Sequence, residues 1–133
     1  MFLHLICCVF PLIFLTLTAN GNDFLDNISL QRIVSCRRKI GSVRLQNCTE
    51  GSIKTWNLEK GNSVQLILNR ESVCCAQWQS HDCRLGLAQD LCDRKEYEVM
   101  SYRMEKIRVM NQRTICGDYK YHEYNCVAPV GTT

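Results

Sequence analysis

The sequence predicts a small, mainly α-helical domain that is held together by disulfides. Two observations support this fold class. Eight cysteines follow an apolar leader, and the apolar residues of two long segments, residues 71–92 and 93–113, recur at helical spacing. A short N-terminal β segment at residues 42–46 is the one addition that the pattern allows.

Residues 1–21 predict a signal peptide. They contain no acidic residue, carry an apolar run from Leu5 to Leu17, and end in the small-x-small pattern Ala19-Asn20-Gly21. The run is too short to span a bilayer comfortably, so a retained anchor is the less favoured alternative. We therefore expect a secreted, extracellular protein with one cysteine-rich domain, residues 22–133, and no stable insertion in a membrane.

Cleavage of the leader removes Cys7 and Cys8 and leaves an even number of cysteines, which implies a disulfide framework of up to four bridges. They are Cys36, Cys48, Cys74, Cys75, Cys83, Cys92, Cys116 and Cys126. Spacing alone cannot choose among pairings, but we expect each outer cysteine to bond to one of the four in residues 71–92. A zinc site is disfavoured, because no CxxC pair occurs and an oxidising compartment favours bridges.

Residues 71–92 predict the central helix. Adjacent cysteines on a helix cannot easily bond each other, so Cys74 and Cys75 should reach two different segments. Trp78 lies one turn after Cys75 and should point inward, packing near Met100 and Met104. The alternative is that Trp78 is an exposed anchor for a partner.

The segment before the central helix is basic. Arg37, Arg38, Lys39 and Arg44 could form a patch for an acidic partner such as heparin or anionic lipid, but a solvated face is favoured because the net charge is only +3. No aromatic residue is interleaved with them, which argues against nucleic acid. A turn at Ile40-Gly41 precedes the possible strand. In residues 49–70 we expect Trp56 in the core and a helix from about Val64, capped by Asn62 or Ser63.

After Cys92, an amphipathic helix is predicted by the stripe Val99, Met100, Met104, Ile107 and Met110. We interpret the stripe as core, although its methionines could also form an adaptable groove. Residues 114–126 have no such stripe and should wrap back over the helices, tied by Cys116 and Cys126. Residues 127–133 should be a loose tail.

Two sequons predict glycosylation and therefore surface positions, at Asn27 and Asn47. Asn47 should be used less readily, because its neighbour Cys48 is expected to be bonded early.

The sequence contains none of the catalytic motifs that its cysteine and histidine pattern suggests. Calcium-dependent secreted phospholipases follow a cysteine pair with His-Asp, but here the residue at the histidine position is Trp78, and the Gly-rich calcium loop is missing. His81-Asp82 is therefore interpreted as a surface pair. There is no GxSxG or HExxH motif, and we expect no enzyme activity, cofactor or metal.

The pattern CCAQWQSHDCRLGLAQDLC, residues 74–92, resembles small secreted arthropod proteins with a CC-x2-W helix. The resemblance implies a toxin-like role in venom, saliva or haemolymph and supplies no site residues. The sequence thus predicts a secreted, non-enzymatic binding protein that acts on an extracellular protein. The alternatives are a small carrier of hydrophobic ligands, its cavity lined by the methionine stripe and Leu66 or Leu68, and a lipid hydrolase.

Overall fold

The computed structural model describes residues 26–58 and 67–129, and the regular structure of these residues is entirely helical. A helix over residues 26–40 is followed by α2 (Ser42–Thr55), α4 (Arg70–Leu91) and α5 (Arg94–Asn111), and the π-helical turn η1 (Gln112–Cys116) continues α5. The predicted fold class, a mainly α disulfide-stapled domain, is confirmed. The leader and the predicted caps Asn62 and Ser63 lie outside the described residues.

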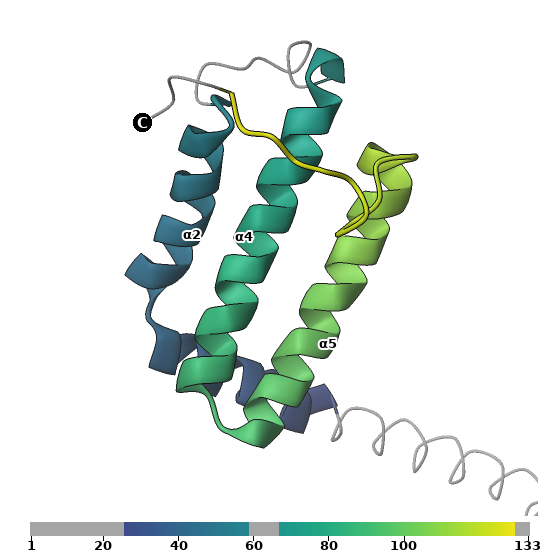
Figure 1. The fold of residues 1–133 in the computed structure, drawn as a ribbon. Helices are drawn as coiled ribbons and strands as arrows, with labels where there is room; N and C mark the ends of the chain where they lie inside the picture. The colour runs from purple at the N-terminus through teal and green to yellow at the C-terminus, as the bar shows by residue number, and fades with distance from the viewer. Residues whose placement is uncertain (1–25, 59–66, 130–133) are drawn as a thin grey trace, which may run out of the picture.

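The helix α4 lies between α2 and α5 and packs against both (Figure 1). The chain runs in one direction along α2 and α5 and in the opposite direction along α4. The helix over residues 26–40, drawn in purple, crosses one end of this bundle. The C-terminal segment, drawn in yellow, crosses the other end from η1 towards α2. Residues 71–92 therefore form the central helix, and the predicted return of residues 114–126 over the helices is confirmed.

Four disulfides connect α4 and its C-cap residue to the flanking segments. They are Cys36–Cys92, Cys48–Cys83, Cys74–Cys116 and Cys75–Cys126. Each joins an outer cysteine to one in the central segment, as expected from the sequence. The bonds span separations of 35 to 56 residues, and closing a loop of that size in the unfolded chain contributes about 4 kcal/mol in the chain-entropy model.

The predicted strand at residues 42–46 is wrong, because these residues begin α2. The buried residues of α2 are Leu45, Cys48 and Ser52, which recur at helical spacing, and the Cys48–Cys83 bond holds this face on α4. A five-residue alternation is too short to outweigh that pattern. The predicted turn before it is confirmed: Gly41 has a φ of 87°, a conformation that glycine adopts readily, and it separates α2 from the preceding helix.

Within the described part of the chain, most of the buried apolar side chains form two clusters, one at each end of the bundle. The first joins the helix over residues 26–40 to the neighbouring ends of α2, α4 and α5; it contains Ile33, Cys36, Ile40, Leu45, Ala88 and Met100. The second lies beneath the C-terminal segment and contains Trp56, Cys74, Cys75, Ala76, Trp78 and Cys116. Three of those six residues are disulfide cysteines, so the bridges themselves supply much of the apolar packing there.

Trp56 and Trp78 are both in the core, each with 6% of its surface exposed. The predicted neighbours of Trp78 are wrong in part, because Met100 belongs to the other cluster. The indole instead meets the ring of Tyr121 edge to face, with centroids 6.1 Å apart. The C-terminal segment, rather than α5, therefore supplies the ring partner of Trp78.

The methionine stripe of α5 is only partly core. Met100 is buried, but Ile107 and Met110 are 48% and 57% exposed. The helix α5 packs against α4 and η1, and its first half also contacts the helix over residues 26–40. No described helix covers the second half of its apolar face, and the prediction that the whole stripe is core is wrong.

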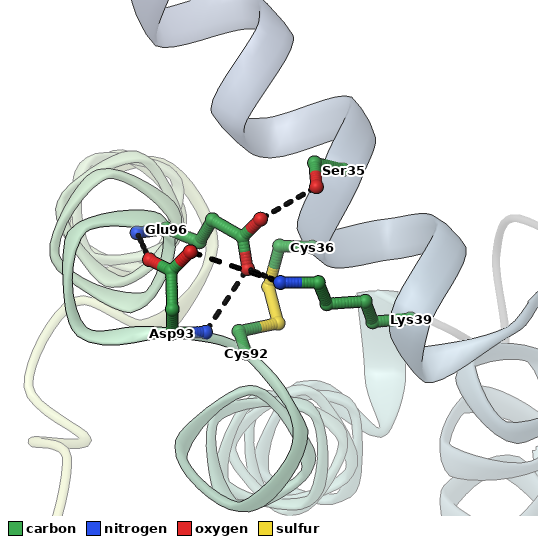
Figure 2. Close-up of polar contacts among 6 residues, drawn as sticks. All are labelled: Ser35, Cys36, Lys39, Cys92, Asp93 and Glu96. Carbon is green, nitrogen blue, oxygen red and sulfur yellow. Dashed lines mark hydrogen bonds and ion pairs between the residues drawn. A yellow bond between two sulfur atoms is a disulfide. The ribbon is translucent and has the colours of Figure 1, made fainter.

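The turn between α4 and α5 is built around a buried carboxylate (Figure 2). Glu96 and Asp93 form a capping box, in which each side chain accepts a hydrogen bond from the backbone N–H of the other, at 3.0 and 2.9 Å. Lys39 Nζ lies 2.8 Å from Glu96 Oε2, and the Ser35 hydroxyl donates to Glu96 Oε1. These bonds from the Lys39 and Ser35 side chains lower the pKa of Glu96 from 4.5 to about 2.

Candidate binding cleft

A cleft of about 390 Å³ opens between α2, α4 and α5, and we call it the apolar cleft. Its apolar wall consists of Ile53, Leu58, Val73, Ala76, Trp78, Met104 and Ile107. Polar side chains complete the lining: Thr49, Ser52, Gln77, Ser80, His81, Arg84, Arg108 and Asn111. A largely apolar hollow with a few polar groups is the usual composition of a small-ligand site, and the volume is within the usual range for one.

The position of the cleft follows from the disulfide that joins α2 to α4. Cys48 and Cys83 are bonded with their Cα atoms 5.7 Å apart, and the next residue on each helix, Thr49 and Arg84, lines the cleft. Arg84 Nη2 donates to the hydroxyl of Thr49 and reinforces the same junction. The covalent link therefore fixes how far apart the two walls stand at this point.

Two polar atoms in the wall of the cleft are buried without a hydrogen-bond partner. They are Gln77 Oε1, an acceptor, and Arg84 Nε, a donor. A buried polar atom that has lost its water and gained no partner costs roughly 1–3 kcal/mol. Both atoms belong to residues that line the same hollow, and both are closed off from solvent in this arrangement of the side chains.

The α5 side of the cleft carries a chain of charged and aromatic groups. Arg108 Nε donates to Glu105 Oε2 at 2.9 Å, and the Arg108 guanidinium lies 4.4 Å from the centroid of the Tyr121 ring. The hydrogen bond from Arg108 lowers the pKa of Glu105. Burial raises the pKa of Tyr121, whose hydroxyl donates to Asp82. Arg108 is therefore already committed to groups of the protein.

The interpretation of His81-Asp82 as a surface pair is wrong for the histidine. The side chain of His81 is only 11% exposed, because Tyr121 packs edge to face on its ring with centroids 5.7 Å apart. Burial lowers the pKa of His81, so the imidazole is neutral at pH 7, 3.9 Å from Glu105. Asp82 remains exposed but accepts from Tyr121 and lies 3.6 Å from His122.

A second, basic hollow lies on the other side of Arg84. Arg37, Arg38 and Arg84 line it together with Gly41, Ser42, Leu45, Gln46, Thr49 and Glu50, and its volume is about 730 Å³. The basic residues of the sequence are thus divided. Lys39 turns away to Glu96 and Asp93, while Arg84 from α4 joins Arg37 and Arg38. Arg44 is not part of this lining.

Other site residues named from the sequence fall in different places. Asn27 and Asn47 are exposed, as expected of glycosylation sequons. Of the methionines proposed to line a carrier cavity, only Met104 borders the apolar cleft. Leu68 is 77% exposed, and Leu66 lies outside the described residues.

Sequence reasoning missed Gln77, Arg84 and Glu96. The spacing Asp93-x-x-Glu96 is a capping-box signature and could have identified Glu96. Nothing in the sequence marks Gln77 or Arg84, because their significance comes from unpaired atoms that only packing reveals.

Within residues 26–58 and 67–129, no three His, Cys, Asp or Glu side chains are arranged to hold a metal ion. None of the helices in these ranges combines the length and apolar character of a membrane span.

Comparison with protein-family models, with curated proteins and with solved structures found no match for the chain. The cleft is therefore interpreted from its own geometry.

Proposed function

We propose that this chain is a secreted, non-enzymatic binding protein whose partner is an extracellular protein. The supporting observation is the outer face of α5. Tyr102 and Met110 are 64% and 57% exposed there, and with Val109 they border one surface hollow. Exposed apolar side chains grouped on one face are typical of protein interaction sites.

The charges around this face define the partner further. Lys106 and Arg113 border the same hollow, and Lys106 Nζ lies 4.5 Å from the centroid of the Tyr102 ring. Glu105 is the one acidic residue of the lining and is already paired with Arg108. A partner with apolar side chains ringed by carboxylates is therefore complementary to it. The four disulfides are compatible with an extracellular location.

Site-specific photo-cross-linking tests this proposal. A photoreactive amino acid replaces Tyr102 in the full chain, and a matched variant carries it at Val43, which is 68% exposed on α2. Each variant is irradiated in the fluid into which the protein is secreted. We expect one discrete protein adduct from position 102 that position 43 does not give, and that Met110→Glu abolishes. Identical adducts from both positions, or none from position 102, would contradict the proposal.

A second candidate function, the carriage of a small hydrophobic ligand, is favoured by the apolar cleft. The cleft has the volume and lining of a ligand site and lies on a different side of α5 from Tyr102. The two functions can be tested separately, because no residue lines both hollows.

A further inference from the structure

The apolar cleft and the basic hollow meet at two residues. Thr49 and Arg84 line both, and the hydrogen bond between them lies at the junction. The seam between α2 and α4 is therefore hollowed on both sides of one arginine. One side is apolar, with Trp78, Met104 and Ile107; the other is basic, with Arg37 and Arg38.

The basic hollow contains guanidinium groups that are not paired with an acidic group of the protein. Among the described residues, Arg37, Arg38 and Arg84 take part in no ion pair, and the Nε of Arg84 is buried with no hydrogen-bond partner. Glu50 is the only acidic residue in this lining, and it accepts a hydrogen bond from Gln46 at 2.6 Å. Three guanidinium groups against one carboxylate leave a net positive hollow.

We propose that these two adjoining hollows together bind a single-chain amphiphile with an anionic head group, of the long-chain carboxylate class. The chain occupies the apolar cleft beside Trp78 and Ile107. The carboxylate lies on the basic side of Arg84, where the guanidinium groups of Arg37, Arg38 and Arg84 attract it. The proposal deepens the second candidate function and rests on it, since it names the class of the carried ligand and its orientation.

Charge complementarity selects this occupant over an uncharged one. A neutral chain would add no counter-charge for the three guanidinium groups, whereas a carboxylate supplies a negative charge beside them. His81, one turn before Arg84 on α4, is held neutral by burial and does not compete for the head group. Arg108 is occupied by Glu105 and the Tyr121 ring.

Isothermal titration calorimetry of the secreted full chain tests the proposal, with dodecanoate below its micelle concentration and dodecanol as the uncharged probe. We expect one molecule of dodecanoate per chain. Arg84→Gln should weaken dodecanoate binding about ten-fold or more and leave dodecanol unchanged. Ile107→Asp, at a half-exposed position in the cleft, should weaken both probes.

Two matched controls separate the site from general effects. Arg103→Gln removes an exposed positive charge that lines neither hollow, and Val43→Asp adds a charge at an exposed apolar position on α2; both should bind dodecanoate as the parent does. Equal weakening by Arg103→Gln, or undiminished binding by Arg84→Gln, would overturn the anionic head-group assignment. Binding of dodecanol alone would also overturn it while leaving the carrier function in place. If neither probe binds, both proposals fail.

Discussion

At the scale of single residues, the burial of Trp78 decides between a role in the core and a role as an exposed anchor for a partner. The sequence allowed it to be either a core residue or an exposed anchor. The structure buries it between disulfide cysteines and Tyr121, with one edge at the apolar cleft. Trp78 is therefore a core residue that also forms part of the wall of the apolar cleft.

We predict that Trp78→Ala lowers the free energy of unfolding by roughly 3–5 kcal/mol, because it removes a large buried side chain and leaves a cavity. The thermal midpoint of the purified, oxidised protein measures this loss. Tyr102→Ala is the matched control, since that ring is exposed on α5 and should change the midpoint little. A Trp78→Ala variant that melts like the parent would refute the core assignment.

At the scale of elements, the sequence was most informative where helical periodicity was long. Residues 71–92 and 93–113 were predicted as helices, and α4 and α5 begin and end within three residues of those limits. The strand predicted at residues 42–46 is wrong, because five alternating residues carry less information than the buried positions Leu45, Cys48 and Ser52 of a whole helix. The exposure of Ile107 and Met110 could not be predicted, since periodicity identifies an apolar face but not what covers it.

The junction between the helix over residues 26–40 and α5 carries a pH-dependent part of the stability. The pKa of Glu96 is about 2 in the folded protein and near 4.5 when its partners are lost. A depressed carboxyl pKa stabilises the folded state fully above the unfolded value, and this contribution is lost as the pH falls from about 5 towards 2.

We therefore predict that Glu96→Gln lowers the thermal midpoint at pH 7 and flattens its fall between pH 5 and pH 2. The glutamine removes the charge that pairs with Lys39 and retains the size of the side chain. Circular dichroism melts across this pH range measure both effects. Glu98→Gln, at an exposed position on the same helix, should follow the parent curve. A Glu96→Gln curve parallel to that of the parent would contradict the assignment.

At the scale of the whole molecule, the cysteines decide the architecture. The apolar core is divided into two small clusters, so the helices depend on covalent links for their relative positions. The even cysteine count predicts that framework. The adjacent cysteines Cys74 and Cys75 do not bond each other, but both bond to the C-terminal segment rather than to two different segments, because Cys116 and Cys126 lie in the same return of the chain. The site was not predictable in the same way. It arises where α2 and α4 are clamped by Cys48–Cys83, and only the packed structure shows Arg84 there with an unpaired nitrogen.

The central claim is that α4 and its C-cap residue hold the flanking segments through four specific disulfides, and mapping them by mass spectrometry tests it directly. Trypsin acts on the unreduced secreted protein. We predict two linked species: peptide 33–37 bonded to peptide 85–94, and peptide 71–84 bonded to peptides 45–54, 114–120 and 121–133.

Electron-transfer fragmentation of the four-peptide species should then assign Cys48 to Cys83, Cys116 to Cys74 and Cys126 to Cys75. Alkylation before reduction should label none of these cysteines. A free thiol, a bond between Cys36 and any residue of peptide 71–84, or a bond between Cys116 and Cys126 would contradict the claim.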